Sequence, residues 1–166
     1  MDGAILVCRV RTSFVRWYTE FMPTEIVERS DDMEALGGRI LASLSPCEGA
    51  TVLALHGNLG AGKTTLTQAI ARSLGVTDTV RSPTFVILQT YPLHSESRFT
   101  TLTHIDAYRI DDEEELRVLG WAELLTDPGR LIVIEWPERV LGLIPPSAIH
   151  VHIEIGKDTE RIISYG

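Results

Sequence analysis

The stretch from Gly57 to Thr64 constrains the fold of this chain more than any other. It reads Gly-Asn-Leu-Gly-Ala-Gly-Lys-Thr, which fits the pattern G-x-x-x-x-G-K-[ST] of a phosphate-binding P-loop. Glycine tolerates positive φ, so the backbone N–H groups of such a loop can turn toward phosphate oxygens. In this pattern the Lys63 ammonium binds the terminal phosphates and the Thr64 hydroxyl binds Mg²⁺. The stretch therefore predicts a site for a nucleotide and Mg²⁺.

The segments on either side of the loop agree with this interpretation. Residues 51–56 form an apolar run rich in β-branched residues, which predicts a strand, and apolar residues then recur every four positions up to a helix stop at Gly75. Strand, loop and helix is the order that a P-loop requires, and a GxGxxG dinucleotide fingerprint is absent from this stretch. We expect the nucleotide to contact Gly57, Asn58, Leu59, Gly60, Ala61, Gly62, Lys63, Thr64 and Thr65.

Composition narrows the class of protein. A chain of 166 residues with 44% hydrophobic residues is long enough for one domain with a sizeable core. The net charge of −8 argues against unaided binding of nucleic acid, which needs a basic patch. Cys8 and Cys47 show neither metal-ligand spacing nor a disulfide framework. No apolar run is long enough for a membrane span or a secretory signal, so we expect a cytoplasmic protein.

The remaining pattern predicts an α/β protein with three layers. We expect a largely parallel central sheet with an antiparallel hairpin at its C-terminal end, around residues 156–159. The expected strands cover residues 24–29, 51–56, 85–91, 99–106, 131–135, 149–155 and 161–165. One helix should start at Ser30, with Asp31 and Glu34 as a capping box. Another should start in the acidic run 111–115, interrupted at Gly120, although that run could also be a docking surface.

The first 21 residues lack a motif. They could form an extra strand, a mobile extension, or sequence upstream of a start at Met22. We favour an N-terminal extension over residues 1–21, followed by a single P-loop ATPase domain over residues 22–166.

A P-loop needs a carboxylate at the end of a neighbouring strand, and two candidates exist. Glu135 ends a four-residue apolar run, which is the form of the strand that holds Mg²⁺ in such proteins. Asp106 ends another expected strand, although it could instead pair with Arg109 to hold the fold. His104 is more simply a packed or hydrogen-bonded histidine than a metal ligand, because one histidine and one aspartate are too few for zinc.

Four motifs together resemble the TsaE family, the bacterial ATPases of tRNA threonylcarbamoyladenosine synthesis. They are, in this order, residues 57–66, the sequence Ser82-Pro83-Thr84-Phe85, residues 104–109 and residues 134–138. The resemblance covers about residues 24–166. It implies ATP binding and hydrolysis in support of the TsaB–TsaD complex, which transfers a threonylcarbamoyl group to the adenosine beside the anticodon. Direct binding of tRNA by this chain is not expected.

The resemblance also implies roles for individual residues. It gives the phosphates to Lys63, Mg²⁺ to Thr64 and Glu135, and the role of catalytic carboxylate to Asp106. Further residues that it places around the site are the switch-like loop of Ser82, Pro83 and Thr84, and the neighbouring Trp136, whose alternative role is ordinary core packing. The chain departs from the family at Asn58, where an acidic residue is common, and in residues 1–21. We expect the change at Asn58 to be harmless because its side chain would point away from the phosphates.

Three other functions are compatible with a P-loop. A GTPase would need an N-K-x-D motif, but Asn58 is the only asparagine in the chain. A small-molecule kinase should carry an arginine-rich lid, whereas Arg109, Arg117 and Arg130 are spread along the sequence. A scaffold that binds ATP without hydrolysing it would release no phosphate.

Overall fold

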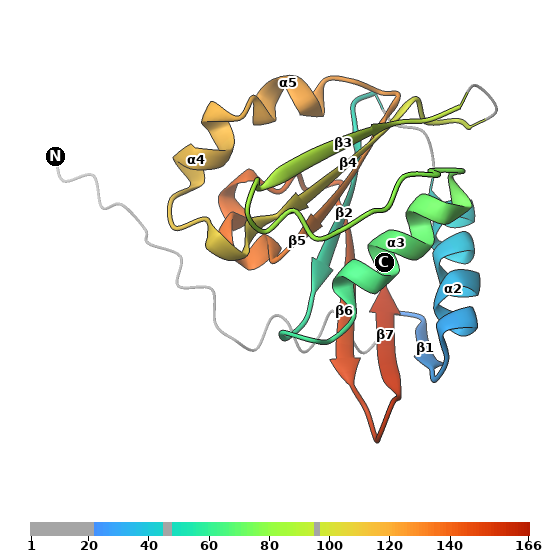
Figure 1. Cartoon of the computed structure of the whole chain (residues 1–166). Helices are drawn as coiled ribbons and strands as arrows, with labels where there is room; N and C mark the ends of the chain where they lie inside the picture. The colour runs from blue at the N-terminus through green and yellow to red at the C-terminus, as the bar shows by residue number, and fades with distance from the viewer. Residues whose placement is uncertain (1–21, 45–47, 95–96) are drawn as a thin grey trace, which may run out of the picture.

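The computed structural model describes residues 22–44, 48–94 and 97–166. Seven strands form a single sheet in the order β1-β7-β6-β2-β5-β4-β3 (Figure 1). The strands are β1 (Thr24–Val27), β2 (Thr51–His56), β3 (Leu88–Pro92), β4 (Thr101–Asp106), β5 (Arg130–Glu135), β6 (Ile149–Ile155) and β7 (Arg161–Tyr165). The α-helices are α2 (Ser30–Ser43), α3 (Lys63–Ser73), α4 (Glu113–Val118) and α5 (Trp121–Leu125). Three short 3₁₀ turns are η1 (Ala107–Arg109), η2 (Pro137–Arg139) and η3 (Leu141–Leu143).

The middle of the sheet is parallel and its edges are antiparallel. Strand β2 pairs in parallel with β5 and β6, and β5 pairs in parallel with β4. The β6–β7 hairpin is antiparallel, as predicted, and so are the pairs β1–β7 and β3–β4. The predicted α/β fold with a mostly parallel central sheet is confirmed.

Helices cover both faces of the sheet and make three layers. On one face, α2 and α3 pack their apolar stripes onto the central strands, and this core includes Met33, Leu36, Ile40, Leu66, Ile70, Leu53, Leu55, Val133 and Val151. On the other face, α4 and α5 insert Leu116 and Trp121 against Val52, Ala54, Ile132 and Ile134. Figure 1 shows the two helix pairs on opposite sides of the sheet. None of the helices in the described ranges is both long and apolar enough to cross a membrane.

Strand register brings the candidate site together. Asp106 at the end of β4 lies opposite Glu135 at the end of β5, and Glu135 lies opposite Leu55 near the end of β2. Because the three strands are parallel, their carboxyl ends share one edge of the sheet, where open α/β sheets bind ligands. The P-loop leaves β2 at that same edge.

Two local predictions need correction. The capping box at the start of α2 was expected to use Asp31 and Glu34. In the structure it uses Asp32, whose carboxylate accepts the backbone N–H of Arg29 at 3.0 Å. The strand expected from Phe85 begins only at Leu88. The backbone N–H groups of Val86 and Ile87 donate to the carbonyl of Pro83 at 2.9 and 2.6 Å, so a turn replaces the first part of that strand.

Other local predictions hold with small changes. Strand β4 begins at Thr101 and not at Phe99, and β1 ends at Val27. The acidic run supplies the first turn of α4, where Asp112 accepts the N–H of Glu114 at 2.9 Å, and Gly120 separates α4 from α5 with a φ of 84°. The N-terminal extension predicted over residues 1–21 lies outside the described residues.

Candidate functional site

The P-loop connects β2 to α3 through glycines that no other residue could replace without strain. Gly57 has a φ of 148°, and a Cβ there would lie 2.5 Å from the carbonyl oxygen of Ile153. Gly62 has a φ of 112° and caps α3 in the left-handed conformation. This backbone wraps the loop around the N-terminal end of the helix, which carries a partial positive charge.

The Lys63 side chain folds back onto the P-loop, where the phosphates of a nucleotide would also bind. Its ammonium donates to the carbonyl oxygens of Gly57 at 2.6 Å and Asn58 at 3.0 Å, and lies 3.7 Å from the ring centroid of Trp136. Burial lowers the pKa of Lys63 from its ordinary value, while the nearby carboxylates of Glu135, Glu138 and Asp106 oppose that shift. An anion in the loop would favour the charged ammonium further.

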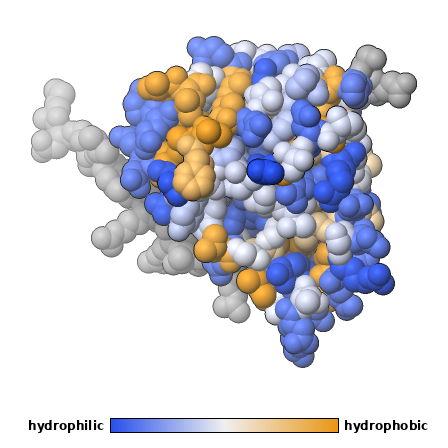
Figure 2. Space-filling view, viewed as in Figure 1, coloured by the Kyte–Doolittle hydropathy of each residue, from blue (hydrophilic) through white to orange (hydrophobic). Residues whose placement is uncertain are grey.

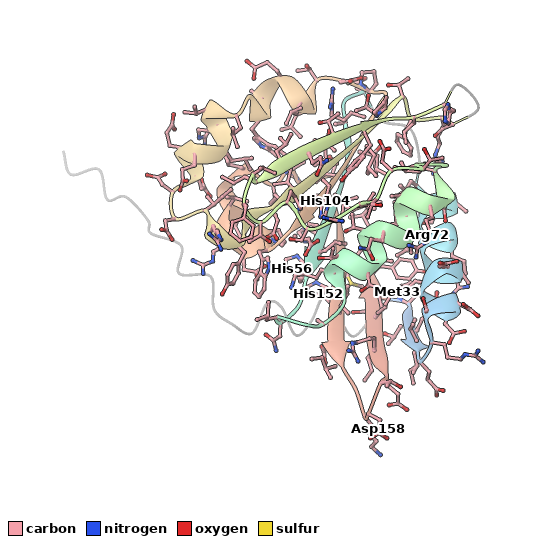
Figure 3. The ribbon with its side chains drawn as sticks, viewed as in Figure 1. Met33, His56, Arg72, His104, His152 and Asp158 are labelled. Atoms are coloured by element: carbon pink, nitrogen blue, oxygen red, sulfur yellow. The ribbon has the colours of Figure 1, made fainter. Side chains whose placement is uncertain are left out.

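Glu135 is buried and hydrogen-bonded from two sides. The Thr64 hydroxyl donates to its Oε1 at 2.8 Å. His104 Nε2 also lies 2.8 Å from Oε1, and since a carboxylate can only accept, the histidine donates. The Glu135 side chain is 3% exposed and that of His104 is fully buried, which is the hydrogen-bonded role predicted for His104 (Figure 3).

Asp106 anchors the loop that precedes β3. Its Oδ2 accepts the hydroxyls of Ser82 at 2.6 Å and Thr84 at 2.5 Å, and its Oδ1 accepts the backbone N–H of Tyr108 at 3.1 Å. Asp106 does not pair with Arg109, which was its alternative role. The Arg109 guanidinium lies instead over the Phe85 ring, 4.4 Å from its centroid.

These groups surround one open cavity of about 350 Å³. Its walls are Leu59, Gly60, Gly62, Lys63, Thr64, Thr65, Ser82, Thr84, Asp106, Tyr108, Glu135 and Trp136. The cavity brings together both candidate carboxylates, both hydroxyls of the switch-like loop and most of the P-loop. The other predicted residues support it from behind, since Gly57 and Asn58 hold Lys63 through their carbonyls, while Ala61 and Pro83 are buried.

Sequence reasoning missed two features of this cavity. Tyr108 forms part of the wall, and its ring stands 5.1 Å from that of Trp136 between centroids. Trp136 itself has a positive φ of 59°, an uncommon backbone that holds its ring beside Lys63. The contact of Trp136 with Lys63 is more than the ordinary core packing that was its alternative role. Nothing in the sequence indicated that Tyr108 would line the cavity, apart from its place in the motif of residues 104–109.

An apolar surface borders the cavity. Phe85 is 84% exposed and Val86 is 65% exposed, and they directly follow Thr84 of the cavity wall. Figure 2 shows apolar side chains gathered on the side of the molecule where α4 and the start of β3 lie.

The donors in the cavity suit Mg²⁺ bound together with a nucleotide. Thr64 and Glu135 supply hard oxygen ligands next to the phosphate-binding loop. In the described part of the chain, no group of three or more His, Cys, Asp or Glu residues could hold a metal ion alone. Mg²⁺ commonly takes one or two protein ligands and completes its shell with water and substrate phosphates, so this small donor set fits that ion.

Comparison with known proteins identifies the relatives of the chain. The family model "Threonylcarbamoyl adenosine biosynthesis protein TsaE" matches residues 27–163. A protein of Rickettsia felis named "tRNA threonylcarbamoyladenosine biosynthesis protein TsaE" is 36% identical over 140 residues, which cover 84% of this chain and 77% of the relative. The protein of the same name from Bacillus subtilis is 38% identical over 114 residues, which cover 69% of this chain and 68% of the relative.

A solved structure shares the fold. The crystal structure of YdiB from Bacillus subtilis superposes with a TM-score of 0.69 at 28% sequence identity. The superposition covers 87% of this chain and 84% of YdiB.

Proposed function

The chain belongs to the TsaE family, and we propose that it binds and hydrolyses ATP with Mg²⁺ to support the TsaB–TsaD complex. Membership of the family places it in the synthesis of threonylcarbamoyladenosine in tRNA. In our proposal it works in the cytoplasm as a support factor. It does not itself transfer the threonylcarbamoyl group.

One observation supports ATP hydrolysis best. The Thr64 hydroxyl and the Glu135 carboxylate meet at 2.8 Å beside Lys63, and Asp106, the neighbour of Glu135 in the strand register, lines the same cavity. Binding of a nucleotide requires the loop and its lysine. Hydrolysis also requires a group that orients the attacking water, and a second carboxylate in the cavity wall can supply it. The arrangement thus supports an enzyme better than a scaffold.

Each group has a distinct role in the proposed reaction. The loop amides and Lys63 hold the β- and γ-phosphates, and Thr64 and Glu135 would hold Mg²⁺, which would neutralise charge on the phosphate oxygens. Asp106 orients a water molecule and accepts its proton as the water oxygen bonds to the γ-phosphorus. The bond from that phosphorus to the β–γ bridging oxygen breaks, and ADP and phosphate leave.

Phosphate release by the purified chain tests this proposal. We expect slow release of phosphate from Mg²⁺-ATP, reduced about 100-fold or more in Glu135→Gln, which keeps shape but loses charge. Glu123→Gln, at an exposed position of α5, serves as the matched control and should match the wild type. Transfer of the γ-phosphate to a small-molecule acceptor in place of water would support the kinase alternative instead.

Binding tests the loop separately. Lys63→Ala removes the charge that faces the phosphates, so ATP affinity should fall at least about tenfold, equivalent to about 1.4 kcal/mol. Unchanged affinity by calorimetry, in a variant with an intact circular dichroism spectrum, would rule out the P-loop as the nucleotide site.

A further inference from the structure

An arginine beside the cavity has no role in the chemistry described above. The guanidinium of Arg109 lies over the Phe85 ring, 4.4 Å from its centroid. We propose that Arg109 is a further catalytic residue, which leaves Phe85 and donates hydrogen bonds to the γ-phosphate of bound ATP, and that Phe85 holds it away from the site between turnovers. This inference rests on the proposed function and adds to it a catalytic residue and a control over that residue.

The cavity lacks a positive charge for the γ-phosphate. Among the described residues in its wall, Lys63 is the only cation, whereas Asp106 and Glu135 both bring negative charge. Phosphoryl transfer spreads negative charge over the oxygens of the γ-phosphate, and an arginine that neutralises it is worth about 10³–10⁵ in rate. Arg109 would supply this charge without changing which bonds form and break.

Arg109 is free of the ion pairs that hold other arginines of the chain. Four arginines each pair with a carboxylate: Arg39, Arg72, Arg117 and Arg130. Within residues 22–44, 48–94 and 97–166, no carboxylate lies at ion-pair distance from the Arg109 guanidinium, and its side chain is exposed. The stacking on Phe85 is therefore the contact that Arg109 must give up in order to move.

The chain places Arg109 next to the wall of the cavity. Arg109 belongs to the turn η1, and Tyr108 directly before it and Asp106 three residues before it both line the cavity. On the other side of the stacked pair, Phe85 directly follows Thr84, whose hydroxyl donates to Asp106 at 2.5 Å. A turn of the Arg109 side chain about its own bonds therefore suffices to direct its guanidinium from Phe85 toward the cavity.

The energies favour this movement when ATP is bound. An exposed cation–π contact shifts an equilibrium only about two- to fivefold, equivalent to about 0.5–1 kcal/mol. Hydrogen bonds from a guanidinium to a phosphate are charge-assisted and match its planar fork, so they are stronger than neutral hydrogen bonds. Arg109 should therefore remain on Phe85 in the free protein and divide its time between Phe85 and the γ-phosphate in the ATP complex.

The exposure of Phe85 makes this contact a point of control. Phe85 is 84% exposed, so a docking protein can cover its ring. Covering the ring removes the resting place of Arg109, and phosphate release should then rise by about the same two- to fivefold. The partner complex of the proposed function would act in this way.

Substitution of Arg109 tests the catalytic role. Arg109→Ala should slow phosphate release from Mg²⁺-ATP at least about tenfold. It should also weaken the binding of ADP with aluminium fluoride, which imitates the γ-phosphate in transfer, and leave the affinity for ADP alone unchanged. Arg117→Ala, at another exposed arginine, is the matched control and should behave as the wild type in all three measurements.

Two results would overturn the catalytic role of Arg109. One is a wild-type rate of phosphate release in Arg109→Ala. The other is an equal loss of affinity for ADP with and without aluminium fluoride, because a contact with the γ-phosphate affects only the first. A wild-type chain that binds ATP but releases no phosphate would contradict the proposed function itself, and the inference with it.

Substitution of Phe85 tests the holding contact. Phe85→Leu keeps an apolar side chain but removes the aromatic ring, so basal phosphate release should rise about two- to fivefold, whereas Phe85→Tyr keeps the ring and should match the wild type. In a chain that already carries Arg109→Ala, Phe85→Leu should have no effect, because the ring acts only through the guanidinium. An unchanged rate in Phe85→Leu, or the same rise with and without Arg109, would overturn the holding role of Phe85.

Discussion

Two carboxylates at neighbouring strand ends have different surroundings, and this difference supports the different roles that we propose for them. Glu135 is fixed by the Thr64 hydroxyl and by buried His104, so its position is set before any ligand arrives. Asp106 is bonded instead to Ser82 and Thr84, both in the loop before β3. A fixed oxygen suits a metal ligand, and an oxygen tied to a loop suits a group that changes partners during turnover.

His104 should act on Mg²⁺ through Glu135. Its Nε2 is the donor to Glu135, and its buried Nδ1 has no hydrogen-bond partner. His104→Leu removes the donor, so the Mg²⁺ concentration that half-saturates ATP binding should rise about tenfold. His104→Gln keeps an N–H donor at similar reach and should restore most of the effect. Calorimetric titration of ATP at several Mg²⁺ concentrations measures this, and an equal defect in both variants would mean that His104 only packs.

The histidines beside the P-loop predict loss of stability in acid. His152 stacks on His56 with ring centroids 4.4 Å apart (Figure 3). Burial, together with the charges of His56 and His150, lowers the pKa of His152 to about 4, and Glu138 opposes this. The pKa in the unfolded chain is about 6.5, so the unfolded state binds more protons below that pH. The stability from a neutral His152 is therefore complete above about pH 6.5 and is lost as the pH falls toward 4.

Urea unfolding between pH 4 and 7 measures this loss. The free energy of unfolding should fall less steeply for His152→Gln than for the wild type. His94→Gln replaces an exposed histidine and should leave the pH dependence unchanged. A pH dependence for His152→Gln identical to that of the wild type would contradict the account.

At the scale of elements, the loop before β3 shows what sequence patterns do and do not reveal. The pattern predicted a strand from Phe85, because Phe85-Val86-Ile87-Leu88 is apolar and partly β-branched. The structure bends instead at Ile87, whose φ of 64° is rare for a β-branched residue. Its carbonyl accepts the N–H of Asp106 at 2.9 Å, a contact that joins distant parts of the chain and leaves no trace in a local pattern.

Elsewhere the local patterns were sufficient. The strand, loop and helix around Lys63 follow from glycine chemistry and four-residue spacing, and the β6–β7 hairpin follows from alternation around a turn. By contrast, the contact of His104 with Glu135 and the place of Tyr108 in the cavity wall depend on how β4 and β5 pair. Pairing between strands is a tertiary property, so His104 and Glu135 could be named from sequence, but neither their contact nor the wall position of Tyr108 could be predicted.

The same loop should act as the switch of the site. The unusual backbone of Ile87 costs on the order of 1–3 kcal/mol, and bonds from Asp106 help to hold it. A strained loop that is tied to Asp106, the proposed catalytic carboxylate, is suited to two arrangements. Thr84→Ala, which breaks one tie, should reduce partner-stimulated phosphate release more than basal release. Thr84→Ser keeps the hydroxyl and is the control, and equal reduction of both rates in Thr84→Ala would argue against a switch.

At the scale of the whole molecule, the N-terminal segment should be dispensable for the site. Among the described residues, those that line the cavity at the P-loop and those that form both cores all lie at position 27 or later. Removal of residues 1–21 should therefore leave ATP affinity and the melting temperature nearly unchanged. A fall of several degrees in a thermal unfolding scan would instead show that the segment is packed on the domain.

The charges of the molecule point to a partner for catalysis. Among the described residues that line the cavity at the P-loop, Lys63 is the single cation, and Arg109 is held over Phe85. A further cation can be worth about 10³–10⁵ in the rate of phosphoryl transfer. The exposed Phe85 and Val86 beside the cavity offer an apolar contact for a partner that brings this cation into place.

Steady-state phosphate release with and without the TsaB–TsaD complex tests the central claim most directly. We expect slow release from the chain alone and a rate several-fold higher at saturating partner concentration, with Glu135→Gln reduced about 100-fold or more in both conditions. Equal rates with and without the complex would contradict a partner-coupled ATPase.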